Sequence, residues 1–246
     1  MSTKGKTAVV TGAAGNAALI IVRALIDDGA QVALVDADAL RLDSLIRFLR
    51  GTTAAVPCNS SEAGAVREAH QKVETVLGPV DILVNCSDAP PPARSDATDP
   101  DEWRRVIGTH LDGAFFWSRA VMPSMRKRNE GRIVNIVSLA AKGAAADPGV
   151  ALAAAQGGLA SLTFALARET AANGITVNAI ALGAIEGSST LEPLNDAQRR
   201  QILAQIPAGR FCKPDELAHA LRFLVSPLAG YITGEVLDLN GGVLMD

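Results

Sequence analysis

Ser138 is the residue of this sequence that is best placed to take part in chemistry. It ends GRIVNIVS, a run of β-branched and apolar residues that is typical of a buried strand. In a parallel α/β sheet, ligands bind beyond the carboxyl ends of the strands, so Ser138 should face the ligand. The next predicted helix begins near Val150, and its first turns should face the same crevice. Acid–base chemistry would need ionisable side chains there, but the sequence places Leu152 and Gln156 at these positions.

Ser138 and His110 together suggest a second chemistry, nucleophilic catalysis. A histidine can act as the base that activates a serine hydroxyl, and Asp88 is the nearby acid that could orient this histidine. A catalytic triad is defined by geometry, so the sequence leaves a Ser138/His110 hydrolase as an alternative hypothesis. In the simpler interpretation, His110 hydrogen-bonds to the backbone and Ser138 only ends its strand.

Segments typical of strands alternate with segments typical of helices along the chain. Strands are expected at Thr7–Thr11, Gln31–Asp36, Thr53–Pro57, Asp81–Asn85, Gly131–Ser138, Ile175–Ala181 and Glu235–Leu239. Helices are expected at Asn16–Asp28, Ala39–Arg50, Ser61–Leu77, Asp101–Arg128, Val150–Ala171, Ala197–Gln205 and Pro214–Leu224. This alternation predicts a single α/β domain over residues 1–246, a Rossmann-type doubly wound parallel sheet with helices on both faces. The polar segment 183–205 is predicted to form a lid over the crevice.

Two features near the N-terminus favour a nucleotide. Gly12 and Gly15 stand between a predicted strand and a predicted helix, the context in which backbone N–H groups can approach a pyrophosphate. Asp36 ends the second strand, where a carboxylate can accept hydrogen bonds from a ribose and would repel a 2′-phosphate. If a dinucleotide binds, these residues favour NAD(H) over NADP(H). A tight turn without a ligand remains the alternative interpretation.

The composition excludes several classes of function. The chain has 246 residues, 48% of them hydrophobic, and a net charge of −3, which gives no reason to expect nucleic acid or an anionic membrane surface as a partner. Three cysteines without CxxC spacing indicate reduced thiols and a cytoplasmic protein. No signal peptide or membrane span is expected, because charged residues interrupt each apolar run. The three histidines are dispersed, so no metal site is predicted.

The sequence resembles the short-chain dehydrogenase/reductase family, most closely its 3-oxoacyl-[acyl-carrier-protein] reductase branch. The resemblance covers the whole chain and rests on motifs that occur in the order typical of the family. These are TGAAGN, VDILVN, GRIVNIVS, LAAAQGGLASLTFALARETAANGITVNAIALG, IPAGRFCKPDELA and YITGEVLDLNGG. The resemblance implies an oxidoreductase that binds a nicotinamide dinucleotide.

The family positions for catalysis are largely replaced. In the family, a tyrosine passes a proton to the substrate oxygen, a lysine lowers the pKa of that tyrosine, a serine orients the carbonyl and an asparagine supports a water. By alignment the serine is Ser138, the tyrosine is Leu152, the lysine is Gln156 and the asparagine is His110. Tyr231 is the only tyrosine and belongs to a different motif. General acid–base help is worth about 10² to 10⁴ in rate, so we expect little or no standard carbonyl reductase activity.

The family positions for the cofactor are also altered. Gly12 is kept, but Asn16 and Ala18 stand at glycine positions, and Asn59 stands where the family has an aspartate that holds the adenine. In the motif that follows the fourth strand, Asn85 is kept and Asp88 replaces a glycine. After the sixth strand, Leu182-Gly183 stands where the family has Pro-Gly, and Gly187 replaces a threonine that binds the carboxamide. Ile185 lies among the positions that face the cofactor in the family. We therefore expect weak binding of NAD(H), if any.

Two hypotheses about function follow. In the first, which we favour, the chain is a non-catalytic relative that serves as a structural, regulatory or ligand-binding subunit. In the second, it is an NAD(H)-dependent oxidoreductase of the 3-oxoacyl reductase type, with altered machinery around Ser138 and a small carbonyl or acyl ligand. In either case the long apolar helices predict a homodimer or homotetramer, or a mixed assembly with an active relative.

Overall fold

One parallel sheet of seven strands forms the centre of the protein. The computed structural model describes residues 3–88, 94–143, 149–188 and 191–245. The strands are β1 (Thr7–Thr11), β2 (Gln31–Asp36), β3 (Thr53–Pro57), β4 (Ile82–Asn85), β5 (Gly131–Ser138), β6 (Ile175–Leu182) and β7 (Val236–Leu239). Their order in the sheet is β3-β2-β1-β4-β5-β6-β7. The predicted doubly wound Rossmann-type sheet is therefore confirmed.

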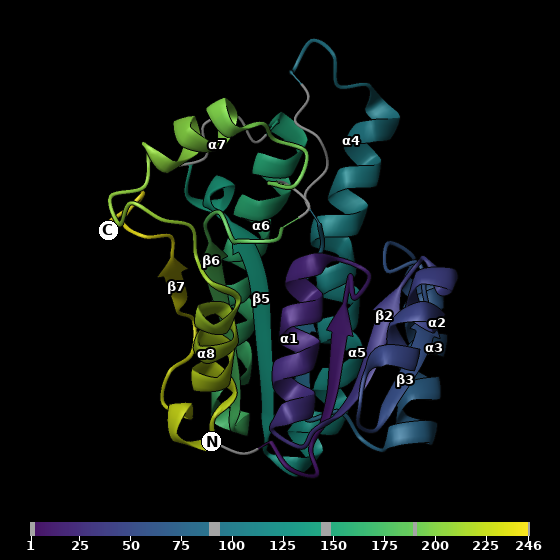
Figure 1. Cartoon of the computed structure of the whole chain (residues 1–246). Coiled ribbons are helices and arrows are strands. Elements are labelled where there is room, and N and C mark those ends of the chain that lie inside the picture. Colours follow the sequence, from purple (N-terminus) through teal and green to yellow (C-terminus); the bar gives the residue numbers. More distant parts are fainter. Residues whose placement is uncertain (1–2, 89–93, 144–148, 189–190, 246) are drawn as a thin grey trace.

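Helices cover both faces of the sheet (Figure 1). The helices are α1 (Asn16–Asp27), α2 (Ala39–Phe48), α3 (Ala63–Leu77), α4 (Pro100–Ile107), α5 (Gly113–Arg128), α6 (Val150–Thr170), α7 (Asp196–Leu203) and α8 (Pro214–Val225), with short turns η1 (Gly108–Asp112), η2 (Leu139–Lys142), η3 (Ala171–Asn173) and η4 (Pro227–Ala229). Side chains of α1, α2 and α8 pack on one face, and those of α3, α5 and α6 on the other. Because neighbouring strand residues point to opposite faces, Val10 joins the first core and Val9 the second. The central strands β1 and β4 are buried at every residue and are therefore mostly apolar.

The sheet order reverses between β1 and β4, which places a crevice beyond the carboxyl ends of these strands. Consecutive strands run outward from β1 through β2 to β3, and outward from β4 through β5 and β6 to β7. The carboxyl ends lie toward the top of Figure 1, where α4, α7 and the start of α6 rise above the sheet. The residues predicted to do chemistry lie along this edge.

The predicted helix 101–128 is not one regular helix. It consists of α4 and α5, joined by the π-helical turn η1. Glycines stand at both ends of this turn, because the helix passes close to the segment after β3. A Cβ at Gly108 would lie 3.0 Å from Cβ of Ser61, and a Cβ at Gly113 would lie 3.1 Å from Cβ of Ser60. Such π-turns are frequent at functional sites, and this one carries His110.

Helix α6 is a core helix with an unusually apolar sequence. By length and composition, Val150–Asn173 is the one helix in the described part of the chain that could cross a membrane, but half of it is buried inside the fold. Ala155 and Leu159 lie in the interior, and the small side chains allow α6 to pack closely on β5 and β6. The apolar side chains of α6 therefore contribute to the core of the fold.

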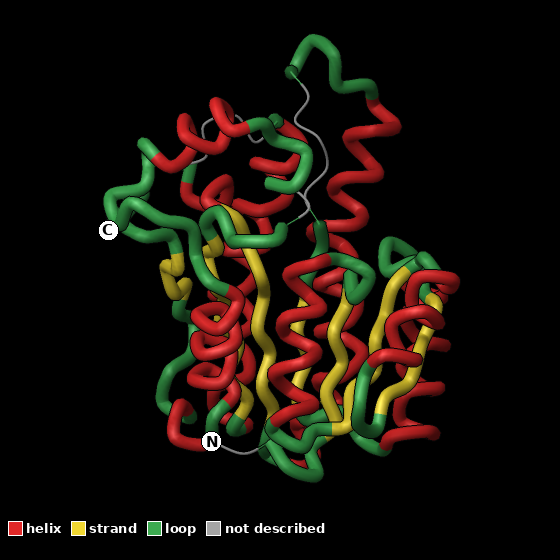
Figure 2. Tube along the Cα trace, viewed as in Figure 1, coloured by secondary structure: helices red, strands yellow, loops and turns green. Residues whose placement is uncertain are grey.

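The segment 183–205 crosses above the carboxyl ends of the strands as loop and short helix (Figure 2). Ile185 forms an isolated parallel bridge with Cys212, and Asn195 and Gln198 form a capping box that begins α7. Residues 189 and 190 of this segment lie outside the described residues. The lid function stays a prediction.

Candidate functional site

The glycine turn between β1 and α1 contains a left-handed glycine that lies close to the segment after β4. Gly12 has a φ of +58°, and a Cβ there would lie 2.9 Å from the carbonyl carbon of Cys86, so no other residue fits. The hydroxyl of Thr11 holds the turn against β4 through bonds of 3.1 Å to both backbone groups of Cys86. Gly15 is the N-cap residue of α1 and has no side chain with which to cap the helix. Ala18 is fully buried in the core, so its methyl group packs between α1 and the sheet.

Asp36 and Asn59 lie beside this turn, as the sequence predicts for groups that would face an adenosine. Each also holds its own local backbone. The carboxylate of Asp36 accepts hydrogen bonds of 3.0 Å from the N–H groups of Ala14 and Asp38. The side chain of Asn59 accepts from the Ser61 hydroxyl at 2.7 Å and donates to Glu62 at 2.8 Å.

We call the cavity at this end of the crevice the outer pocket. Its empty space measures about 610 Å³, part of which is open to solvent. The outer pocket is lined by Thr11, Gly12, Asp36, Ala37, Cys58, Asn59, Ser60, Ser61, Asn85, Cys86, Ser87, Thr109, His110, Gly113, Ala114 and Leu159. It runs from the nucleotide-type residues at Asp36 to the π-helical turn at His110.

A second cavity, the inner pocket, lies where the family resemblance places the chemistry. Its empty space measures about 660 Å³, again partly open. It is lined by Ala17, Cys86, Ser87, Asp88, His110, Ile136, Val137, Ser138, Leu152, Gln156, Leu182, Gly183, Ile185 and Ser188. Ser138, Leu152, Gln156 and His110 are therefore brought together, as the sequence predicts. The two pockets share Cys86, Ser87 and His110.

Leu152 and Gln156 are built into the fold. Leu152 is buried in an apolar cluster with Val106 of α4. Gln156 is 3% exposed, and its Oε1 accepts a hydrogen bond of 2.8 Å from the backbone N–H of Ser138. Neither side chain carries a charge or a titratable proton. The hydroxyl of Ser138 accepts from the N–H of Ala140 at 3.3 Å and so begins the short turn η2.

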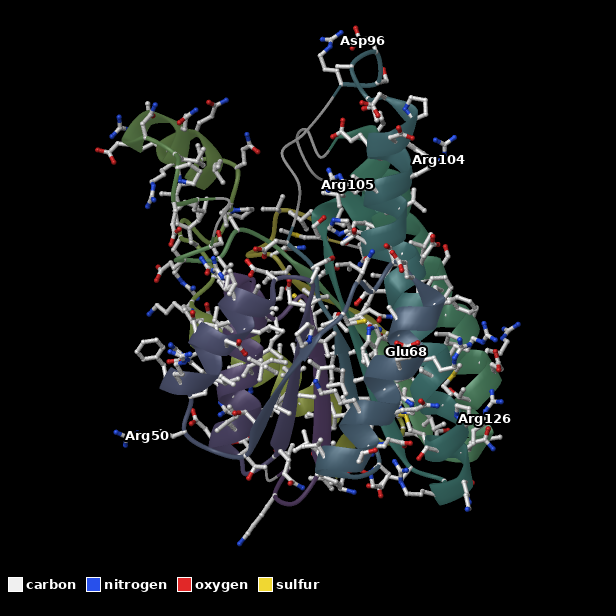
Figure 3. All side chains as sticks on the ribbon, turned by 90° about the vertical axis from the view of Figure 1, so that its right-hand side faces the viewer. Arg50, Glu68, Asp96, Arg104, Arg105 and Arg126 are labelled. Atoms are coloured by element: carbon white, nitrogen blue, oxygen red, sulfur yellow. The ribbon has the colours of Figure 1, made fainter. Side chains whose placement is uncertain are left out.

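His110 is hydrogen-bonded to Ser87, which was not among the predicted site residues. Its Nδ1 lies 2.7 Å from the hydroxyl oxygen of Ser87, whereas Ser138 is bonded to Ala140. His110 is 4% exposed. Burial lowers its pKa to about 4, and the positive charge of Arg105 on α4 adds to the shift (Figure 3). At neutral pH this histidine is uncharged and a weak base.

The position of Ser87 in the sequence is a simple signal for a residue that faces the crevice. It follows the carboxyl end of β4 and stands between Asn85 and Asp88, which were both predicted to face the ligand. Its neighbour Cys86 is not a nucleophile, because burial raises the pKa of the thiol to about 12. Asn85 has a structural role, since its amide donates to Asn135 at 2.8 Å and thereby joins β4 to β5.

Asp88 and Asn16 change the middle of the crevice. Asp88 lies directly against Gly15, where a Cβ would be 2.7 Å from the carboxylate carbon of Asp88. Asn16 donates a hydrogen bond of 2.9 Å to the carbonyl oxygen of Gly187 and so ties the glycine turn to the segment after β6. Ile185 of that segment is buried in the core. The glycine turn is therefore covered by groups of the chain itself.

Among the described residues, no group of three or more His, Cys, Asp or Glu side chains is arranged to hold a metal ion. The three cysteines are all free thiols.

Comparisons with known proteins agree with the fold and the order of the motifs. Residues 12–244 match the sequence family described as enoyl-(acyl carrier protein) reductase. The chain is 37% identical over 246 residues to 3-oxoacyl-[acyl-carrier-protein] reductase of Escherichia coli (strain K12), and the alignment covers both proteins completely. The chain is a short-chain dehydrogenase/reductase.

Two further members of the family are similar over nearly the whole length. A subunit of (2S)-[(R)-hydroxy(phenyl)methyl]succinyl-CoA dehydrogenase from Thauera aromatica is 35% identical over 244 residues, which are 98% of this chain and 95% of the relative. The crystal structure of a putative short-chain alcohol dehydrogenase from Sinorhizobium meliloti 1021 superposes with a TM-score of 0.90 at 31% identity. That match covers 98% of this chain and 97% of the other.

Members of the short-chain dehydrogenase/reductase family generally bind NAD(P)(H). Gly12, Asp36 and Asn59, which the sequence predicts to face an adenosine, line the outer pocket. The middle of the crevice does not fit a pyrophosphate, because the Asp88 carboxylate lies against Gly15. The described lining of the two pockets also contains two carboxylates and no lysine or arginine.

Proposed function

We propose that this short-chain dehydrogenase/reductase is a non-catalytic member of its family that serves as a structural or ligand-binding subunit. The observation that carries the proposal is the state of Leu152 and Gln156. One side chain is packed in an apolar cluster, and the other is hydrogen-bonded to the backbone of Ser138. Neither can deliver a proton to a substrate oxygen, and His110 is neutral and hydrogen-bonded to Ser87.

The name of one relative supports a role as a subunit. The Thauera aromatica protein is named as a subunit of a dehydrogenase. We propose that this chain likewise assembles, as a homodimer or homotetramer or with an active relative. An active partner would supply the proton donor that this chain lacks. The free cysteines agree with a cytoplasmic location.

The alternative function is an NAD(H)-dependent oxidoreductase of the 3-oxoacyl reductase type with altered machinery around Ser138. The full-length similarity to 3-oxoacyl-[acyl-carrier-protein] reductases favours it, as does the position of Asp36 beside the glycine turn. A Ser138/His110 hydrolase is a third hypothesis. The two residues line one pocket, but each is hydrogen-bonded to another group.

Titration with NADH and NADPH separates the first two functions. For the non-catalytic subunit we expect dissociation constants weaker than about 0.1 mM, less favourable than roughly −5.5 kcal/mol, with any residual preference for NADH. Asp88→Gly should tighten binding, because it removes the carboxylate from the glycine turn. Asp96→Gly, in the loop before α4 and outside the lining of both pockets, is the matched control and should have no effect. A micromolar dissociation constant for the wild-type protein, with turnover of a 3-oxoacyl thioester that Ser138→Ala abolishes, would establish the alternative function.

A further inference from the structure

Residues 183–188, which follow β6, are held in place by backbone hydrogen bonds and by packing. The N–H of Glu186 donates to the carbonyl oxygen of Cys212 at 2.9 Å, and the N–H of Cys212 donates to that of Ala184 at 2.9 Å. Ile185 lies between these bonds, is 3% exposed and belongs to the core cluster that includes the buried side chains of α1. We call residues 183–188 the strap.

One side chain ties the strap to the start of α1. The Nδ2 of Asn16 donates a hydrogen bond of 2.9 Å to the carbonyl oxygen of Gly187. Asn16 is the first residue of α1 and stands at a family glycine position, where no side chain could make this bond. Gly187 stands at a family threonine position and has a φ of +71°, a conformation that a β-branched residue would adopt only with strain. The two residues therefore both depart from the family pattern, and in this chain they bond to each other.

The bond from Asn16 places the strap beside the helix end that a phosphate group would need. Phosphates bind to backbone N–H groups at the N-terminus of a helix. At the start of α1, the N–H of Gly15 already donates to the carbonyl oxygen of Gly12 at 3.0 Å, and the Asn16 side chain is bonded to the strap. The strap also forms a wall of the inner pocket, which it lines through Gly183, Ile185 and Ser188.

We propose that Asn16 is an autoinhibitory latch, which holds the strap over the start of α1 and keeps the glycine turn closed to a dinucleotide. A dinucleotide would then bind only to the fraction of molecules in which the bond from Asn16 to Gly187 is broken, and its measured affinity is reduced by that fraction. This gives a conformational cause for the weak cofactor binding expected under the proposed function, on which this consequence rests. The latch itself is a property of the chain without cofactor.

Amide hydrogen exchange of the strap tests the latch directly. The reporter is the N–H of Glu186, whose bond to Cys212 breaks when the strap lifts. Asn16→Asp keeps the size of the side chain but turns an oxygen toward the carbonyl of Gly187, while a carboxylate in the first turn favours the helix. We expect exchange at Glu186 to become about threefold to tenfold faster, as the loss of one hydrogen bond predicts. Asn173→Asp, in the turn η3 before the amino end of β6, is the control and should not change it. Unchanged exchange in Asn16→Asp would overturn the proposal.

Titration with NADH tests the consequence for the cofactor. The comparison uses the Asp88→Gly background, which lacks the carboxylate that lies against Gly15. We expect Asn16→Ala in this background to tighten NADH binding about threefold to tenfold, because a larger fraction of molecules is open. Asn173→Ala is the control and should leave the affinity unchanged. Equal affinities with Asn16 and with Ala at this position would overturn the latch as a barrier to the dinucleotide. Hydrogen exchange needs no cofactor, so it tests the latch independently of the titration and turnover tests of the proposed function.

Discussion

Leu152 and Gln156 are the two residues on which the proposed non-catalytic function depends. Both lie at the start of α6 beside Ser138, where a proton donor and a cation would be needed for carbonyl reduction. Here they provide packing and a backbone hydrogen bond instead. Under the proposed function, these two residues leave the start of α6 without a proton donor and a cation, while the fold remains that of the family.

Restoring turnover should require changes at both ends of the crevice. We expect no NADH-dependent carbonyl reduction above background in the wild-type protein, and none in Leu152→Tyr alone, because a tyrosine with a pKa of about 10 needs a nearby cation. Leu152→Tyr with Gln156→Lys should give trace activity only when Asp88→Gly is added to admit the cofactor. The rate of NADH oxidation with a 3-oxoacyl thioester as substrate measures this reductase activity. Wild-type activity that survives Ser138→Ala would mean that the reaction uses another site.

His110 should make the protein less stable as the pH falls. Burial lowers the pKa of this residue to about 4 in the folded state, against 6.5 in the unfolded chain. Between these values the unfolded chain binds a proton that the folded chain does not. The free energy of unfolding therefore decreases as the pH falls from 6.5 to 4 and does not change through this residue above 6.5.

Urea unfolding at pH 7 and pH 4.5 measures this effect. Between pH 7 and pH 4.5, we expect the free energy of unfolding of His110→Asn to decrease by about 2 kcal/mol less than that of the wild-type protein. The exposed His219→Asn is the control and should behave as the wild type. Burial also lowers the pKa of His70, but that contribution is common to all three proteins and cancels. Equal losses in wild type and His110→Asn would contradict the prediction.

At the scale of the elements, Gln156 joins α6 to the carboxyl end of β5. Its carbonyl oxygen is the hydrogen-bond acceptor for the N–H of Ser138, which is the last residue of the strand. Gln156→Leu fills a similar space but leaves this N–H without its partner. We expect a loss of about 1–3 kcal/mol in the free energy of unfolding, measured by urea denaturation. Gln201→Leu, on the exposed side of α7, should change stability much less.

The π-helical turn is the element that positions His110. The turn joins α4 to α5 without a break in the helix, and its glycine ends lie close to Ser60 and Ser61. The extra residue in the turn also rotates the side chains that follow it, because a π-turn departs from the 3.6-residue repeat. The apolar pattern of the sequence carries no mark of this turn, so a single helix over 101–128 was the natural prediction and was wrong in this detail.

At the scale of the whole molecule, the helices that flank the sheet leave apolar side chains exposed. Phe164 of α6 is 51% exposed, and Phe115 of α5 is 39% exposed on the same side of the sheet. Leu228, Tyr231 and Met245 are exposed near the C-terminus. Such surfaces favour association through closed two-fold contacts.

We expect light scattering to give the mass of a dimer or tetramer at micromolar concentration. Phe115→Glu with Phe164→Glu should lower the mass, because two charges would then face each other across the symmetry axis. Val76→Glu, an equally exposed apolar residue on α3, should leave the mass unchanged. A monomeric wild-type protein would contradict the expectation. Co-purification from the native cell tests for a mixed assembly. The mixed assembly is supported if a catalytically intact relative co-purifies with this chain and is contradicted if none does.

The sequence by itself determined the sheet, its flanking helices and the candidate site positions. Apolar periodicity and glycine turns are local signals, so five of the seven strands begin at the predicted residue, and β4 and β7 begin one residue later. The alignment of motifs located Ser138, Leu152, Gln156 and His110 around one pocket, because parallel strands end at a common edge.

Only the tertiary structure decided how these residues are connected. The Ser87–His110 hydrogen bond joins residues 23 positions apart, and the bond from Asn16 to Gly187 spans 171 positions. The position of Asp88 against Gly15 likewise depends on β1 and β4 lying side by side. Contacts of this kind form only when distant segments are positioned relative to each other to within a few tenths of an ångström. No local pattern of residue types encodes that positioning. Residue types and their order therefore predicted where the crevice lies, and packing determined which of its polar groups face a ligand.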